Sequence, residues 1–282
     1  VETRRFLFGG HLPSLPYVNE AGVLAADAAA AEALVEKART LARRRRARFV
    51  ELRNRHPVNC DELTSVRTDK VRMTRVLPDT PDALWSDISS KVRNQVRKGE
   101  KSGLNVRWGG ERLLDAFYHV FAINMRDLGT PVYPRRLFEA ILRHFADDAE
   151  LCVVDLEGDP VAGALLLHGP DATEVPSASS LREYNKTCAN MLMYRHLLDR
   201  AIQRGATVFD FGRSTVDGGT FRFKQQWGAE ASPTGWQHLT RRRQAKPITP
   251  DSGGFSLAVE TWKRLPVWLT RLAGPPIVRG IP

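Results

Sequence analysis

Residues 152–168 read CVVDLEGDPVAGALLLH, and this stretch decides the class of fold. Two apolar runs of strand length flank the turn sequence Glu157-Gly158-Asp159, so the stretch predicts a β-hairpin. The segments that come before it have apolar residues at helical rather than alternating spacing. Helices followed by a hairpin within one chain indicate a mixed α/β (α+β) fold.

Three helices are predicted before the hairpin. The first covers residues 85–98, the second begins near Glu111, and the third covers residues 134–145. The apolar stripe of the first helix is formed by Trp85, Ile88, Val92 and Val96. A loop with Pro78 and Pro81 precedes this helix, so we place the boundary between two lobes at residue 85.

After the hairpin, strands and helices are predicted to alternate. In order they are a strand at 174–180, a helix at 189–204 closed by Gly205, a strand at 208–212, a short basic helix at 220–227 and a strand at 235–239. Periodicity alone indicates no more than an α+β or α/β arrangement of these elements.

The segment at 27–50 is rich in alanine and then in arginine. Its spacing predicts a helix that Asp27 caps, with cations in the last turn, where the helix dipole favours them. The stretch Arg43–Arg48 has two interpretations: a nucleic-acid contact, or the solvated end of a helix.

The chain has 282 residues, of which 42 are Lys or Arg and 32 are Asp or Glu, so its formal net charge is +10. Hydrophobic residues make up 42% of it, which argues against disorder. The charge predicts partners that carry phosphate or other anionic groups. It is concentrated in four clusters: Arg43–Arg48, Lys91–Lys101, Arg213–Lys224 and Arg241–Arg243.

Cysteine and histidine usage gives no sign of a metal site. Cys60, Cys152 and Cys188 form no CxxC pair, and the seven histidines lack metal-ligand spacing, so we expect a reducing compartment and no metal. The sequence has neither an apolar run of 18 residues nor an apolar signal core, so we expect a cytoplasmic protein that does not span a membrane. Val1 comes just before a predicted strand at residues 6–8, which suggests that N-terminal sequence is missing.

The segment Asp210-Phe-Gly-Arg213-Ser214 ends a predicted strand. Ligands of open α/β sheets bind beyond the carboxyl ends of strands, so Arg213 and Ser214 are candidates for holding an anion. Asp210 alternates with Phe209 and Phe211, and a carboxylate on a strand face is either partnered or functional. The structural alternative is a bond from Asp210 to neighbouring backbone or to Arg213.

The segment Phe221-Arg-Phe-Lys224-Gln-Gln-Trp227-Gly228 alternates aromatic and cationic residues. Acyl transfer to an amine needs a cation or hydrogen-bond donor near the carbonyl oxygen as negative charge develops there. Lys224 is the candidate for this role. The alternative is a surface helix whose aromatic residues lie in the core.

Two further segments are dense in hydrogen-bonding side chains: SSLREYN at 179–185 and NMRDLGTPVYP at 124–134. The first ends a predicted strand and the second ends a predicted helix. A substrate-binding rim and a capped loop explain each of them equally well.

Together these motifs resemble the Fem family of non-ribosomal peptidyltransferases, FemAB-like proteins of tandem GNAT-type acetyltransferase lobes. More narrowly, they resemble the branch found with exosortase/PEP-CTERM exopolysaccharide loci. The order of the predicted elements is also that of a GNAT-type fold. Besides the two segments just described, the resemblance is carried by LFG at 7–9 with SLPYVN at 14–19, KVRN at 91–94 with VRK at 96–98, FDFGRST at 209–215 and GTFRFKQQWGAE at 219–230.

This resemblance implies transfer of an acyl group to an amine of a cell-wall precursor, and in the best-understood members an aminoacyl group comes from tRNA. It places Lys224 near the donor carbonyl and Arg213 near phosphate, with the basic helix at 91–98 entering the second lobe. Three departures matter. The helical hairpin of some tRNA-using members is missing, the first lobe lacks its opening strands, and the acetyl-CoA pyrophosphate loop (Q/R)xxGx(G/A) fails at Glu230 in its nearest string.

We therefore expect tandem GNAT-like lobes: a partial first lobe at 1–84, an acyltransferase lobe at 85–245 and an amphipathic tail at 246–282. Lys224 and Asp210 are assigned to catalysis. The residues assigned to substrate binding are Arg213, Ser214, Arg182, Tyr184, Asn185, Asn124, Asp127, Tyr133, Lys91, Arg93, Arg97 and Trp227. No cofactor is expected to bind tightly, and aminoacyl-tRNA or acyl-CoA is the expected co-substrate. The alternatives are an N-acyltransferase that uses acyl-CoA on a sugar or small amine, and a non-catalytic RNA- or membrane-binding protein.

The tail from Phe255 to Leu272 is amphipathic and is interrupted by Pro266. Its tryptophans lie beside cations, a combination typical of docking on an anionic membrane interface, here the cytoplasmic face of the inner membrane. The alternative is packing against the first lobe.

Overall fold

The computed structural model describes residues 3–5, 9–47, 49–60, 63, 65–66, 70–240 and 256–280. The chain forms two compact units. Unit 1 comprises Val1–Arg72, Ser232–Ser256 and Pro276–Pro282, and unit 2 comprises Met73–Ala231 and Leu257–Pro275. The lobe boundary expected at residue 85 thus lies within unit 2. The strand expected at 6–8 and the cluster Arg241–Arg243 lie outside the described residues.

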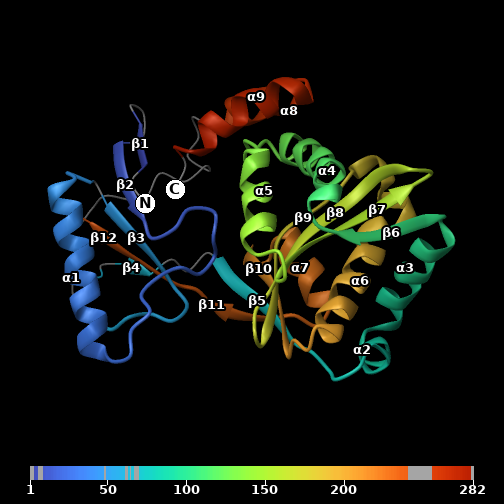
Figure 1. The fold of residues 1–282 in the computed structure, drawn as a ribbon, viewed down its shortest axis with the longest axis horizontal. Helices are drawn as coiled ribbons and strands as arrows, with labels where there is room; N and C mark the ends of the chain where they lie inside the picture. The colour runs from blue at the N-terminus through green and yellow to red at the C-terminus, as the bar shows by residue number, and fades with distance from the viewer. Residues whose placement is uncertain are drawn as a thin grey trace. The chain divides into compact units, whose positions relative to one another are not determined.

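Unit 1 is a five-stranded sheet with one helix on it (Figure 1). The strand order is β1 (Thr3–Arg5), β2 (Gly9–Pro13), β3 (Phe49–Asn54), β12 (Gly235–Thr240) and β4 (Ser65–Val66). The helix, α1 (Ala28–Arg44), begins as predicted, because Asp27 Oδ1 accepts a hydrogen bond from the Ala30 amide at 2.7 Å. The fully buried Val35 packs α1 on the sheet. The strand expected at 235–239 exists, but it belongs to this sheet rather than to that of the second lobe.

Unit 2 is built on a seven-stranded sheet. Its order is β11 (Glu230–Pro233), β5 (Lys70–Val76), β10 (Val208–Thr215), β9 (Ala172–Ser180), β8 (Asp159–His168), β7 (Ala149–Leu156) and β6 (Leu104–Gly109). The predicted hairpin is confirmed as β7 and β8, which pair antiparallel up to Leu156 and Asp159. Glu157 and Gly158 both have positive φ, 55° and 95°, as a two-residue hairpin turn requires.

The strands β9 and β10 are parallel neighbours, but they pair over a short distance only. The paired residues are Val208–Asp210 on β10 and Ala172–Glu174 on β9. Beyond them, β9 continues to Ser180 along β8, and β10 continues to Thr215. The two strands therefore leave each other halfway along their length, toward their carboxyl ends.

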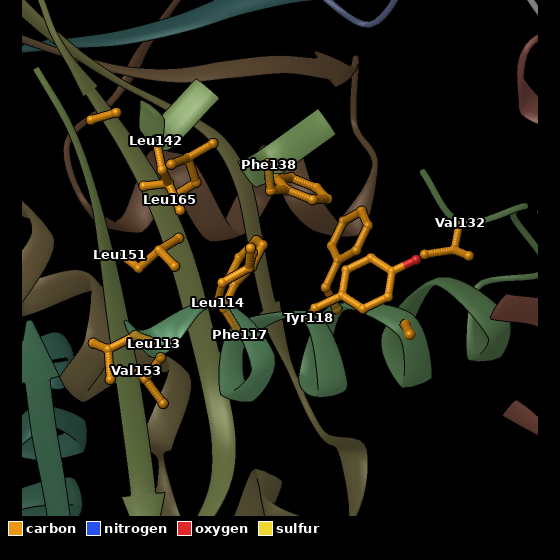
Figure 2. Close-up of a cluster of buried hydrophobic side chains, with 13 residues drawn as sticks. Leu113, Leu114, Phe117, Tyr118, Val132, Phe138, Leu142, Leu151, Val153 and Leu165 are labelled. Atoms are coloured by element: carbon orange, nitrogen blue, oxygen red, sulfur yellow. The ribbon is translucent and has the colours of Figure 1, made fainter. Parts of the chain in front are cut away.

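One face of the unit 2 sheet is covered by α4 (Leu114–Asp127), which follows the short 3-10 helix η1 (Glu111–Leu113), and by α5 (Arg135–His144). Figure 2 shows the aromatic and aliphatic side chains of these helices meeting those of β7 and β8. Phe138 is the centre of this core, because its ring meets those of Phe117 and Phe121 edge-on at 5.0 Å each. On β8, Gly163 allows the helix to approach closely, since a Cβ there would lie 3.3 Å from the Phe117 ring.

The helix predicted at 85–98 is wrong as a single element, because the chain breaks it in two (Figure 1). The first part is α2 (Pro81–Asp87) and the second is α3 (Ser90–Lys101). Between them Ile88 is extended, and the Ser89 hydroxyl accepts a hydrogen bond from the Val92 amide at 3.3 Å. The apolar spacing continues across a new helix start that Ser89 caps, which periodicity alone does not detect.

The tail forms α8 (Ser256–Lys263) and α9 (Val267–Val278), and Pro266 separates them as predicted. Packing on the first lobe is wrong for most of the tail, because residues 257–275 belong to unit 2. There, α8 lies so close to Gly129 that a Cβ on this residue would be 2.5 Å from Val259 Cγ1. Only the end of α9 belongs to unit 1, where the Tyr17 hydroxyl donates to the Val278 carbonyl at 2.9 Å.

Candidate functional site

The site begins with strand β10, which presents two chemically different faces. Phe209 and Phe211 lie on one face with their rings 4.8 Å apart, and Phe211 stacks on Tyr194 of α6 (Ala189–Gln203) at 5.8 Å. Alternation along a strand places Asp210 and Ser214 on the opposite face. The aromatic packing therefore fixes the orientation of the polar face.

Lys224 lies on α7 (Gly219–Gln226), the helix that follows β10. Its side chain is buried, with 7% of the residue exposed, although long cationic side chains almost always reach water. Its Nζ donates to the carbonyl oxygens of Gly212 at 3.3 Å and Arg213 at 2.8 Å. An ammonium has three N–H groups, so one donor remains after these two bonds. The surface-helix alternative does not account for a lysine held in this way.

The pKa of Lys224 lies close to neutral pH. Burial lowers its pKa from 10.5 to about 8, the carboxylate of Asp210 opposes this, and the guanidinium of Arg213 adds to it. At neutral pH the ammonium form still predominates. A small change in surroundings would move this group between donor and neutral amine.

Strand β10 carries two further polar groups, those of Asp210 and Ser214. Asp210 is buried, and its Oδ1 accepts a hydrogen bond from the Gly212 amide at 2.7 Å. This turn requires Gly212, whose φ of +71° suits glycine and strains other residues. Ser214 is also buried, and its hydroxyl has no hydrogen-bond partner among the residues that the structure describes. We call Asp210, Gly212, Arg213, Ser214 and Lys224 the Lys224 group.

The position of the Lys224 group in the sheet favours a ligand site. The group begins at Asp210, the last β10 residue that pairs with β9. From there to Thr215, the edge of β10 that faced β9 is released from the parallel ladder. Open α/β sheets bind ligands beyond the carboxyl ends of their strands, where such a separation leaves backbone and side-chain groups available.

A second group of assigned residues meets at the carboxyl end of β9. There the Asn124 side-chain amide donates to the Ser179 hydroxyl at 3.0 Å, joining α4 to β9. The guanidinium of Arg182 lies 3.4 Å from the Asp127 carbonyl oxygen, a long contact. Ser179 is missing from the sequence-based assignment, although it begins the SSLREYN motif that signals this region.

In the remaining residues of these motifs, it is mainly the backbone carbonyls that form hydrogen bonds. Tyr184 and Asn185 belong to the 3-10 helix η2 (Arg182–Thr187), where their carbonyls accept bonds from Thr187 and Cys188. The carbonyl of Tyr133 accepts a hydrogen bond from the Tyr118 hydroxyl at 2.9 Å. Asp127 pairs with the neighbouring Arg126 at 2.7 Å.

The basic residues of α3 do not join the Lys224 group. This helix packs chiefly against α6, where Gly99 approaches Leu192. Arg93 is held by the C-terminal carbonyls of α2, with Nη1 2.6 Å from the Ile88 oxygen, so it serves as a helix cap rather than a free cation. Arg97 lies over the ring of Trp85 at 5.4 Å, and Lys91 is exposed. Trp227 is fully buried beside Tyr194, where it packs the core.

Two further observations concern metal binding and membrane spanning in the described part of the chain. No group of three or more His, Cys, Asp or Glu side chains there is arranged to hold a metal ion. None of the described helices has the length and apolar character needed to cross a bilayer.

Comparison with known proteins agrees with this architecture. Residues 86–225 match the family described as "Acetyltransferase (GNAT) domain". No curated protein matches the chain significantly in sequence. Among solved structures, FemX is similar with a TM-score of 0.62 and 16% identity, over 82% of this chain and 80% of that one. The C-terminal domain of a putative lysylphosphatidylglycerol synthetase from Agrobacterium fabrum gives a TM-score of 0.58 and 14% identity, over 77% and 75%.

A third structure, L-PGS from Bacillus licheniformis, has a TM-score of 0.54 and 11% identity, over 82% of this chain and 78% of that one. Identities this low establish the fold and not the substrate. The α/β class and the GNAT-like fold expected from the sequence are confirmed. Residues 86–225, which include Lys224 and nearly all of α7, therefore match the acetyltransferase (GNAT) domain family, and the fold is GNAT-like.

Proposed function

We propose that this protein transfers an acyl or aminoacyl group from an activated ester or thioester donor to an amine of a cell-wall or exopolysaccharide precursor. The observation that carries the proposal is the buried ammonium of Lys224, which keeps one N–H beyond its bonds to Gly212 and Arg213. The GNAT domain supplies the reaction class, and the similarity in fold to FemX and to a lysylphosphatidylglycerol synthetase supports an aminoacyl cargo.

The reaction requires the protein mainly to position the two substrates and to stabilise the charge that develops on them. The amine nitrogen attacks the acyl carbon, the bond from that carbon to the ester oxygen or thioester sulfur breaks, and the amine loses a proton. Lys224 stabilises the negative charge that develops on the carbonyl oxygen, a role in which one donor contributes about 3 kcal/mol. Asp210 receives the proton of the amine, directly or through water.

The other residues of the site hold the two substrates. Arg213 and Arg182 lie at the ends of β10 and β9, where they meet the phosphates of donor and acceptor. The unpartnered hydroxyl of Ser214 hydrogen-bonds the donor beside Lys224. Neither tRNA nor CoA is a resident cofactor in this scheme, since each arrives charged and leaves discharged.

An acyl-CoA donor with a sugar or small amine as acceptor is the second candidate. It is favoured by the match of residues 86–225 to the acetyltransferase model. The two candidates share the Lys224 group; the second restricts the donor to acyl-CoA and has a different acceptor.

One experiment tests both candidates. The protein is incubated with candidate acceptors and either acyl-CoA or aminoacyl-tRNA, and mass spectrometry follows the mass added to the acceptor. Lys224→Met is compared with Lys37→Met, which removes an exposed lysine of α1. We expect Lys224→Met to lower the transfer rate by about 100-fold or more and Lys37→Met to leave it unchanged. Wild-type turnover in Lys224→Met would refute the proposal, and salt-dependent tRNA binding without transfer would indicate a binding protein instead.

A further inference from the structure

The tail helix α9 exposes apolar side chains on its outer face, which we define as Trp268, Arg271 and Leu272. Of these, Trp268 is 67% exposed and Leu272 is 69% exposed, although both are large hydrophobic residues. Their spacing of four residues places them on one side of the helix, and Arg271 lies next to them. Trp268 is also the only tryptophan among the exposed large hydrophobic residues of the described chain.

The exposure of this face is fixed by the packing of the opposite face. Val267 packs on the core that α4 and α5 share, and Thr270 is buried. Gly274 approaches the chain so closely that a Cβ there would lie 2.8 Å from the Val132 amide nitrogen. A rotation of α9 that buried Trp268 would break all these contacts, so the outer face is held outward.

After Glu260, the charged residues of the described tail are all cations. From Thr261 to the end of the described tail at Gly280 there are four cations, Lys263, Arg264, Arg271 and Arg279, and no acidic residue. Lys263 is paired with Glu260 at 2.6 Å on α8. Arg264 and Arg271 are exposed, although the Arg271 guanidinium also lies over the ring of the buried Tyr118, 5.1 Å from its centre.

Tryptophan beside arginine on the outer side of a surface helix matches one kind of partner. The indole ring prefers the headgroup level of a bilayer, and arginine is attracted to anionic lipid headgroups. A protein partner would also bury Trp268 and Leu272, since tryptophan and arginine are enriched at protein interfaces, and the test below distinguishes this occupant from a bilayer. Nucleic acid would not favour Leu272.

We propose that the outer face of α9, with Arg264, docks this protein on the surface of an anionic lipid bilayer. The helix lies in the plane of the headgroups with Trp268 and Leu272 inserted, and Arg264 and Arg271 contact the lipid phosphates. Two apolar residues give weak and reversible binding, so the protein exchanges between surface and solution. Since binding needs no turnover, it is measured independently of the proposed transfer reaction.

Docking through the tail would also bring the candidate site close to the lipid surface. Gly129 and Val132, on which α8 and α9 pack, lie two and five residues after Asp127 in sequence, and the carbonyl of Asp127 contacts Arg182. The lipid surface would therefore lie next to the carboxyl end of β9. An acceptor anchored in that surface would reach the site without leaving the membrane.

Vesicle co-sedimentation of the full chain tests this proposal. Vesicles of phosphatidylcholine with phosphatidylglycerol are compared with vesicles of phosphatidylcholine alone, at low and high salt. The double variant Trp268→Ser/Leu272→Ser is compared with Leu24→Ser/Phe145→Ser, which removes two exposed apolar residues elsewhere. We expect binding to the anionic vesicles only, weaker at high salt, reduced at least tenfold in the first double variant and unchanged in the second.

Two further measurements complete the test: one of the contribution of the arginines, and one of how deeply Trp268 enters the bilayer. Arg264→Gln/Arg271→Gln should lower binding to anionic vesicles more than Arg43→Gln/Arg44→Gln, which removes two exposed cations of α1. Lipids brominated on the acyl chain should quench the fluorescence of the wild type, and less so that of Trp268→Ser. Equal losses in the two arginine variants would overturn the proposal, as would binding unaffected by Trp268→Ser/Leu272→Ser. A wild-type dimer that dissociates in that variant, without vesicle binding, would assign the face to a second copy.

Discussion

Replacing Lys224 by methionine is expected to change stability in a way that depends on pH. In the folded protein, burial lowers the pKa of Lys224 from 10.5 to about 8, despite the opposing charge of Asp210. The folded state therefore binds this proton less tightly than the unfolded state, and the charged lysine costs stability. A pKa difference of about 2.5 corresponds to about 3 kcal/mol, because each pKa unit is worth about 1.4 kcal/mol.

The sign of the effect follows from proton linkage. Below pH 8 both states carry the proton, and the full cost of about 3 kcal/mol is present. Between pH 8 and 10.5 the unfolded state binds more protons than the folded state, so this group makes the wild type more stable as pH rises. Above pH 10.5 the cost is gone. A methionine side chain cannot titrate, so the variant shows none of this dependence.

Urea unfolding at pH 7.5 and at pH 10 measures this difference. The variant also loses the two bonds to Gly212 and Arg213, but the neutral amine makes these bonds as well, so they affect both pH values similarly. We expect the stability of Lys224→Met relative to wild type to fall by about 2 to 3 kcal/mol between the two pH values. Lys37→Met, on the surface of α1, should show no such change. A difference between Lys224→Met and wild type that stays constant with pH would refute the argument that Lys224 is buried as a strained cation.

Three more predictions concern residues of unit 2 outside the Lys224 group. Glu150 is buried, which opposes its ionisation, but hydrogen bonds from His168 and Arg200 outweigh burial and lower its pKa to about 2. Glu150→Gln should therefore lower the free energy of unfolding by about 2 to 3 kcal/mol, measured in urea at pH 7. This loss should shrink as pH falls from 4.5 toward 2. Arg93→Met should lower Tm without changing the KM for the donor, because Arg93 caps α2 through three backbone carbonyls. Gly274→Ala should cost about 1 to 3 kcal/mol and expose the tail to limited proteolysis, because the new methyl would press on the Val132 backbone.

The sequence predicted the elements of unit 2 well wherever the local signals agreed with one another. The hairpin at 152–168 combined two apolar runs with a turn that required positive φ, and it forms as expected. The single helix at 85–98 failed because Ser89 caps a new helix without disturbing the apolar spacing. The pairing of β12 with β3 in the other sheet joins segments some 180 residues apart, and no local pattern records such a partnership.

For the candidate site, the sequence predicted which residues lie close together better than it predicted what each side chain binds. Sequence order alone brings a strand and the helix that follows it close together. The site residues that share this pair of elements are Asp210, Arg213 and Ser214 on β10 and Lys224 on α7. Arg93 looked like a phosphate ligand for the same reason that it caps α2: a guanidinium satisfies carbonyl oxygens as well as it satisfies phosphates. Which oxygen a cation meets depends on tertiary neighbours that the sequence does not show.

The burial of Lys224 is the strongest reason to look for function in this group. A protein selected for stability alone has no cause to hold an ammonium where its pKa falls to about 8, or to leave the buried Ser214 hydroxyl of β10 without a partner in the described chain. Each feature costs free energy, and both costs are reduced when a ligand supplies a carbonyl or phosphate oxygen to the spare N–H and to the hydroxyl. A donor substrate at the end of β10 would therefore stabilise the folded protein, and the pH at which it does so best should lie below 8, where Lys224 carries its charge.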